Sequence, residues 1–423
     1  MSLPPPPAPP PPPSPPPPRP GDEPVQLADG ARRYDLDALR AVAMLLGIVL
    51  HSAIAFLPYY DEGDTGSSVL FALFEYIHLW RMPLFFVLSG YFTALLWRRR
   101  GLRPLLRQRA ERIALPLALL YVPIIVLVVA GFIVGAAVGD VDLDDLSQDT
   151  AAYEDPNAGD EEQTEEEAGD GFSFAHMWFL WHLLWLLAGF AAFAWVADHT
   201  ILRRDRAPPA ILGRLLTWFL PLVSLVPFSQ MSEDTLGPDT SEGLVPAAHV
   251  LGFYATFFAF GCAMFRHDGA TSGPIDRLGR WWPAQLATSV IVFVLLDGDV
   301  FSDELSEPLE VALAWTVSFA MIGAFRQRMA VPSFRARWLS DASYYMYLVH
   351  LPIVFVMQGV VMALGLAPIP AFIVIVAVTV SLLVPSYRFG VRYTPIGRLL
   401  NGRRTPDGDV RLRAAIAVSQ AER

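Results

Sequence analysis

Apolar and polar residues occur along this chain in long alternating blocks, rather than at the short intervals of a soluble helix or strand. A helix needs about 20 apolar residues to cross the hydrocarbon core of a bilayer. Because blocks of about that length recur, they predict an all-α integral membrane protein with about ten transmembrane helices. The predicted spans are about 35–58, 69–97, 113–138, 174–197, 211–227, 246–265, 281–296, 308–325, 338–364 and 369–389.

The charges between these blocks alternate in sign. Arginines crowd the segments after the second, fourth, sixth and eighth spans, whereas acidic residues follow the first, third, fifth and seventh. Since arginine-rich loops remain in the cytoplasm, this pattern predicts that both termini are cytoplasmic. The acidic loop 139–172 is then extracytoplasmic. We expect a multi-pass protein of the cell (inner) membrane.

The two ends of the chain differ from the apolar middle. Residues 1–33 begin with a proline tract that cannot form a packed core, so we expect a disordered cytoplasmic N-terminus. This tract also lacks the apolar core of a cleavable signal peptide. The predicted membrane domain extends over 34–400, and residues 401–423 form a cytoplasmic tail.

Composition changes this picture little. Hydrophobic residues make up 53% of the 423 residues, which excludes an ordinary soluble domain. The single cysteine, Cys262, excludes an intramolecular disulfide framework and a cysteine-based metal site. The candidate chemistry therefore has to come from the few polar residues inside the spans.

The first span contains two ionisable residues, Arg40 near its start and His51 deep inside it. The eleven-residue step between them is three helical turns plus roughly 20°, so both lie on one face, about 16 Å apart. Asp37 and Gly47 fall near the same line. Arg40 could instead reach the inner surface and pair with Asp37, with His51 satisfied in the core. Ionisable groups within a membrane are usually functional, which favours a functional face.

The second span contains Arg81 near its outer end, where the other outer segments avoid arginine. This position favours an anion site over an interfacial anchor. Ser89 could donate a hydrogen bond to an oxyanion, or Ser89-Gly90 could form a close-packing notch, and both interpretations stay open. A pair between Glu75 and Arg81 is a further alternative.

The ninth span contains a third polar stripe. Ser343, Tyr347 and His350 share one helix face because they are spaced by four and seven residues. His350 either orients a substrate or satisfies a buried hydroxyl, and these two roles stay open.

Several motifs together resemble a known family. The strongest are Arg40 followed after ten residues by His51, and His78-x-x-Arg81-Met-x-x-Phe-Phe-x-x-Ser-Gly. Over residues 34–390 the chain resembles membrane acyltransferase family 3 and, within it, the glucan biosynthesis protein C branch. Supporting matches are Arg109-x-x-Arg112-Ile-x-x-Pro, His176-x-Trp178-Phe-Leu and Ser343-Tyr344-x-x-Tyr347-Leu-x-His350-x-Pro.

The resemblance implies ten spans and an acyltransferase. The acyl group, succinyl favoured and acetyl possible, would pass from cytoplasmic acyl-CoA to a hydroxyl of an extracytoplasmic glycan. Acyl-CoA is then a co-substrate, and no bound cofactor is expected. The implied partners are acyl-CoA, the glycan acceptor and membrane lipid, without nucleic acid, and the oligomeric state stays open.

The resemblance also implies roles for individual residues. Catalysis falls to His51, either as a general base or as a transiently acylated nucleophile. Arg40, Arg81 and Arg112 are expected to bind anionic parts of the donor or acyl group. No metal is expected, because the histidines lack close pairing with carboxylates. The predicted substrate-binding residues are Arg40, Arg81, Arg112, His78, Ser89, Trp178 and His350.

The main alternative function is a polytopic transporter or lipid flippase that uses the charged face of the first span as a substrate path. The sequence has no evident internal repeat, which counts against an inverted-repeat transporter. The proline tract and the acidic loop 139–172 depart from the family's pattern. An acidic rim would repel an anionic acceptor, so the choice of acceptor stays open.

Overall fold

The computed structural model describes residues 33–54, 65–141, 173–199, 218–232, 236–264 and 279–421. Residues 1–32 of the predicted N-terminal segment and most of the acidic loop 139–172 lie outside these residues, as do the arginine-rich loops at 203–206 and 266–277. Within the described ranges the regular structure is entirely helical, without a strand. The predicted all-α fold class is therefore confirmed.

Thirteen α-helices make up the described fold. The π-helix η2 (Ala110–Ala114) joins α3 to α4, the 3-10 turn η3 (Ala175–Met177) precedes α6, and the π-helix η5 (Ser386–Val391) extends α14. The α-helices are α1 (Tyr34–Ile54), α2 (Thr65–Arg100), α3 (Leu102–Arg109), α4 (Leu115–Gly139), α6 (Trp178–Asp198), α8 (Leu225–Phe228), α9 (Ala248–Met264), α11 (Trp282–Asp297), α12 (Asp303–Arg328), α13 (Phe334–Ala363), α14 (Pro368–Pro385), α15 (Pro395–Asn401) and α16 (Pro406–Ala421).

Seven helical segments of the described chain are long and apolar enough to cross a membrane. Three shorter apolar helices, Trp218–Phe228, Ala248–Met264 and Trp282–Asp297, coincide with the fifth, sixth and seventh predicted spans. The long segments coincide with the other seven predicted spans, so the protein is a multi-pass membrane protein. The exact number of spans and the orientation of the termini stay predictions.

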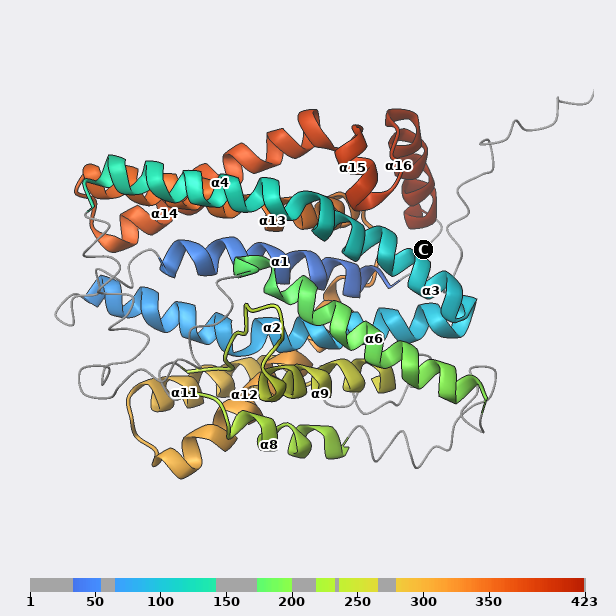
Figure 1. Cartoon of the computed structure of the whole chain (residues 1–423), viewed down its shortest axis with the longest axis horizontal. Helices are drawn as coiled ribbons and strands as arrows, with labels where there is room; N and C mark the ends of the chain where they lie inside the picture. Colours follow the sequence, from blue (N-terminus) through green and yellow to red (C-terminus); the bar gives the residue numbers. More distant parts are fainter. Residues whose placement is uncertain are drawn as a thin grey trace, which may run out of the picture.

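Helix α1 lies in the middle of the bundle (Figure 1). It packs against α13 on one side and against α2 and α12 on the other. Helix α4 lies at the periphery, where only 17% of the apolar window in Leu102–Gly139 is buried, compared with 78% of the window in Thr65–Arg100. An exposed surface of this kind suits contact with lipid. Helix α1 is consequently surrounded by other helices, and the interior of a bundle is where a membrane protein keeps functional groups.

The close packing of α4 on α13 and of α2 on α9 depends on glycine. In α4, Gly135 lies so near α13 that a Cβ atom would overlap the backbone carbonyl of Phe355. In α2, a Cβ atom on Gly90 would overlap the backbone of Phe258 in α9. Small residues allow helices to approach in this way in membranes. The contact favours the close-packing interpretation of the Ser89-Gly90 pair.

We predict that Gly135→Leu lowers the thermal stability of the purified protein by several degrees. The added side chain meets backbone that cannot move aside, and overpacking of this kind costs about 1–3 kcal/mol or more. Gly189→Leu is the matched control, because nothing lies within 4 Å of a Cβ at that position of α6. Unfolding of both variants in the same detergent measures the difference. Equal stability of the two variants would contradict this account of the α4–α13 contact.

Candidate active site

Three histidines from separate parts of the chain meet beside α1. His51 is contributed by α1, His176 by η3 and His350 by α13. Their ring centroids are 5.1 Å apart for His51 and His350, 5.5 Å for His176 and His350, and 6.4 Å for His51 and His176. This group, the histidine cluster, contains the predicted catalytic residue and one of the predicted binding residues.

Hydrogen bonds to backbone carbonyls determine the tautomers of two members of the cluster. His350 donates from Nδ1 to the carbonyl of Tyr347 at 2.7 Å, and His176 donates from Nε2 to the carbonyl of Leu348 at 3.2 Å. A carbonyl only accepts, so the bonded nitrogen carries the proton in each ring. The remaining nitrogens, Nε2 of His350 and Nδ1 of His176, are buried and have no hydrogen-bond partner among the described residues.

His51 is the most accessible member of the cluster. Its side chain is half-buried, whereas His350 is 1% and His176 is 7% exposed. Within the described part of the chain its imidazole makes no hydrogen bond, although its backbone carbonyl accepts one from Gln358 at 3.4 Å. A neutral imidazole keeps one nitrogen lone pair for accepting a proton. His51 is therefore the member of the cluster best placed to accept a proton from a bound molecule.

Arg81 lies against α1 one helical turn from His51. Its Nη1 atom is 2.6 Å from the position that a Cβ on Gly47 would occupy, so the missing side chain makes room for the guanidinium. Arg81 is 8% exposed, its Nε has no hydrogen-bond partner, and the described residues give it no ion pair. A buried charge without a partner is costly, which indicates a site that an anion completes.

The alternative partner of Arg81 has another role. Glu75 accepts a hydrogen bond from the backbone N–H of Leu236 at 2.9 Å, so the pair with Arg81 is not formed. His78 is similarly occupied, because its Nε2 donates to the carbonyl of Pro238 at 2.9 Å. Both side chains hold the segment around residues 236–238 against α2. His78 thus has a structural contact with Pro238, and its role in substrate binding stays a prediction.

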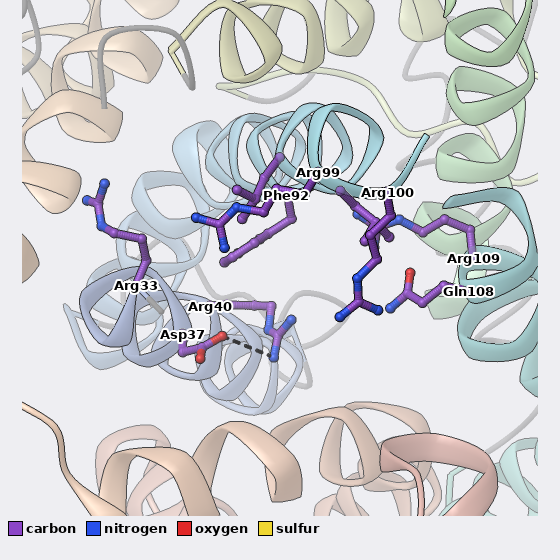
Figure 2. A pocket seen from close by; sticks show the side chains of 10 residues that line it. Arg33, Asp37, Arg40, Phe92, Arg99, Arg100, Gln108 and Arg109 are labelled. Carbon is purple, nitrogen blue, oxygen red and sulfur yellow. Dashed lines mark ion pairs between the residues drawn. The ribbon is translucent and has the colours of Figure 1, made fainter. Parts of the chain in front are cut away.

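A basic pocket of about 410 Å³ opens at the other end of the polar face of α1, between α1, α2 and α3. Figure 2 shows Arg40 and Asp37 on one side of this pocket, with Arg100 and Arg109 across from them. Arg40 is 3.8 Å from Asp37 and donates to Ser340 Oγ at 2.9 Å. The arginines that line the pocket are Arg33, Arg40, Arg99, Arg100 and Arg109. Such a concentration of guanidinium groups suits phosphate.

Three predicted binding residues lie elsewhere. Arg112 is turned towards Gly402, next to α15, and Arg109 from the same motif lines the pocket instead. Trp178 packs in the aromatic core, with its ring 5.5 Å from that of Tyr254. Ser89 lies two helical turns beyond Arg81 and beside the α2–α9 contact, and its carbonyl accepts from Thr93 at 2.7 Å.

His176 is the member of the cluster that was absent from the predicted site residues. Its motif with Trp178 was visible in the sequence, but nothing local related it to the first span. The Tyr347 hydroxyl donates to the His176 backbone carbonyl at 2.6 Å and so joins α13 to η3. The one local feature that could have marked His176 as a site residue is its position at the start of an apolar stretch. Its proximity to His51 depends on how three distant segments pack.

The arrangement combines the half-buried imidazole of His51, the buried guanidinium of Arg81 and a separate pocket lined by arginines. His51 and the pocket-lining Arg40 share the face of α1, about 16 Å apart along the helix axis. Among the described residues, no group of three or more His, Cys, Asp or Glu side chains could hold a metal ion. The expectation that no cofactor is bound stays a prediction.

Comparisons with known proteins agree with the geometry. The family model of the acyltransferase domain, family 3, matches residues 33–388. Proteins named glucans biosynthesis protein C from Salmonella heidelberg, Salmonella typhi and Salmonella typhimurium are each 25% identical over 331 residues, which is 76% of this chain and 82% of theirs. No solved structure matches the chain significantly. Because the family match covers most of the sequence, this chain belongs to the membrane acyltransferase family 3.

Proposed function

We propose that this protein transfers an acyl group from acyl-CoA to a hydroxyl of a glycan on the opposite side of the membrane. The observation that carries the proposal is the buried Arg81 guanidinium, without an ion pair in the described chain, one helical turn from the half-buried His51. The glycan acceptor is supported by the relatives named glucans biosynthesis protein C. The match of the acyltransferase family model to residues 33–388 favours acyl transfer over the transporter alternative.

The basic pocket is the proposed site for the nucleotide end of acyl-CoA. Its phosphates would meet Arg40 and Arg109, and the pantetheine arm would extend along α1 towards His51. The step from Arg40 to His51 along α1 is eleven residues, which corresponds to about 16 Å. The donor would then enter from the arginine-rich side, the cytoplasm, of the cell (inner) membrane. The thioester would meet the acceptor within the protein.

The proposed chemistry is a direct acyl transfer. The imidazole of His51 removes the proton of the glycan hydroxyl, and the oxygen attacks the thioester carbonyl. This attack forms a C–O bond and gives a tetrahedral intermediate. The intermediate collapses when its C–S bond breaks. The proton passes from His51 to the departing CoA thiolate, so the imidazole is neutral again. In the alternative two-step route, His51 itself carries the acyl group before the glycan attacks.

We further propose that the favoured acyl group is succinyl. Its distal carboxylate would pair with the Arg81 guanidinium, which has a geometry that matches carboxylate oxygens. The absence of an ion pair to Arg81 in the described residues supports this assignment. An acetyl group has no distal carboxylate and would leave Arg81 without an anion.

The function is tested by following both products with purified protein reconstituted in vesicles. We expect free CoA to appear from succinyl-CoA only when glucan is added, and the glucan to gain an equal amount of ester-linked succinate. CoA release that does not depend on glycan would contradict transfer to this acceptor. Movement of glycan or lipid across the vesicle membrane without ester formation would favour the transporter or flippase function.

We predict that Arg40→Ala raises the KM for acyl-CoA by about 10- to 100-fold and changes kcat little. A hydrogen bond between charged groups contributes about 1.5–3 kcal/mol, and Arg40 is remote from the reacting atoms. The control is Arg107→Gln in α3, because Arg107 is exposed and pairs with Glu111 at 2.8 Å outside the pocket. Equal increases in KM for the two variants would contradict a specific role for Arg40.

A further inference from the structure

A second cavity, of about 840 Å³, lies at the end of the bundle where α13 begins and η5 ends. We call it the α16 pocket, because Asp409 and Arg413 of α16 form part of its wall. It shares no lining residue with the pocket that contains Arg40. The proposed acyl transfer therefore does not account for it.

The α16 pocket has an excess of positive charge. Arg335, Arg388, Arg392 and Arg413 line it, with Asp409 as its one acidic lining residue. Asp409 is already engaged, because Arg392 donates to its two carboxylate oxygens at 2.8 and 2.9 Å. In the described part of the chain the other three arginines make no ion pair. The pocket therefore holds three positive charges without an anionic partner.

The Asp409 carboxylate stays ionised in this environment. Burial by itself would raise the pKa of Asp409, but the hydrogen bonds donated by Arg392 and Tyr393 hold that pKa below its ordinary value. At neutral pH the negative charge of Asp409 is therefore paired with Arg392. It does not compensate the three arginines across the cavity.

Aromatic side chains provide the rest of the wall. The Arg413 guanidinium lies 4.2 Å from the ring centre of Phe334, and that of Arg388 lies 5.2 Å from the ring centre of Phe389. Phe389 is 79% exposed and continues the outward-facing apolar surface of α14, where Leu382 is 53% exposed. The rim of the pocket is thus continuous with a surface suited to lipid.

Helix α16 lies near one end of the long apolar helices. Figure 1 shows α16 running almost at right angles to the long helices, across one end of the bundle. Helix α14 ends at Pro385, and Arg388 of η5 lies near the end of the apolar segment Pro368–Val391. Helix α16 follows after α15, and it brings Arg413 back to the same pocket. At the end of an apolar span, arginine and aromatic residues typically lie among the lipid headgroups, while the apolar surface of the span contacts the acyl chains.

We propose that the α16 pocket binds the phosphate headgroup of an anionic phospholipid, whose acyl chains lie along the exposed face of α14. Three uncompensated guanidinium groups provide the charge complementarity for the phosphate. The exposed Phe389 and Leu382 favour a phospholipid over a soluble phosphate, because a soluble ligand gains nothing from an apolar rim. Basic pockets between transmembrane helices on the cytoplasmic side bind such headgroups in other proteins.

The test compares two lipids with identical acyl chains, phosphatidylglycerol and phosphatidylcholine, on the purified full chain by native mass spectrometry. We expect the wild type to retain phosphatidylglycerol preferentially, and Arg388→Gln/Arg413→Gln to weaken its binding by at least about tenfold. The control is Arg280→Gln/Arg328→Gln. These arginines also stack on aromatic rings, Trp281 at 5.3 Å and Trp282 at 4.2 Å, but lie outside the pocket.

Each other outcome overturns the proposal. Equal retention of the two lipids, or an equal loss in the control variant, would show that headgroup charge at this pocket is not recognised. Displacement of the lipid by glycerol phosphate at matched concentration would indicate a site for soluble phosphate. If the double variant fails to fold, Arg388→Gln alone provides the test, because Arg388 is exposed. Undiminished phosphatidylglycerol binding in that variant would contradict the assignment.

Discussion

Replacing His51 by alanine is expected to abolish acyl transfer while the amount of folded protein stays unchanged. General acid–base catalysis contributes about 10²- to 10⁴-fold in rate, and His51 is the accessible member of the histidine cluster. The measurement is kcat with succinyl-CoA and glucan at matched protein amounts. Residual activity above roughly a tenth of the wild-type value would argue against His51 as the base.

The control for this prediction is His182→Ala in α6. Unlike His51, His182 is fully buried, its Nδ1 donates to the Trp178 carbonyl at 3.1 Å, and its ring lies 5.0 Å from that of Trp178. We expect this substitution to lower stability without an equal loss of kcat in the protein that remains folded.

Mass spectrometry of the quenched wild-type reaction distinguishes direct transfer from the two-step route through an acylated His51. An acyl group on His51 would favour the two-step route.

Replacing Arg81 by methionine is expected to reduce succinyl transfer by well over tenfold and acetyl transfer much less. Removal of one partner from a desolvated charge pair can cost about 2–5 kcal/mol, and only succinyl brings the second charge. The assay compares succinyl-CoA with acetyl-CoA on membranes that carry equal amounts of each protein. Equal losses with the two donors would mean that Arg81 serves the fold, the acceptor or the common chemistry.

Two further variants refine the Arg81 result. Arg81→Lys keeps the charge but loses the paired donors, so we expect it to recover part of the preference for succinyl. Gly47→Ala keeps the arginine at position 81 but puts a methyl group 2.6 Å from the present position of its Nη1 atom. The guanidinium must then shift, and we expect a smaller loss of the same preference. Retention of the full preference in Gly47→Ala would contradict the geometry of the site.

The apolar pattern was sufficient for the fold class and for the relation between Arg40 and His51. Helix-forming stretches in a membrane depend on local length and hydropathy, so the predicted spans coincide with ten apolar helices of the described chain. The relation within α1 depends only on helical periodicity. The proposal of an anion site at Arg81 could also be made from the sequence, because a charged residue inside a membrane span is usually functional whatever its neighbours are.

Local sequence could not distinguish between neighbouring members of one motif. Arg109 and Arg112 are three residues apart, yet Arg109 lines the basic pocket while Arg112 is turned towards Gly402. The π-helix η2 begins directly after Arg109 and contains Arg112, and it alters the angle at which successive side chains leave the helix. The partner of Glu75 was equally undetermined, because the N–H of Leu236 comes from a segment 161 residues away.

The sequence by itself determined an all-helical membrane protein of the acyltransferase family, with an arginine and a histidine on one face of its first span. Only the tertiary structure decided that His176 and His350 meet His51 and that Arg81 fills the space left by Gly47. The physical reason is the range of the forces involved. Hydropathy and helical periodicity can be read from a few consecutive turns of one helix. The histidine cluster instead depends on the packing of α1, η3 and α13, which are far apart in the chain.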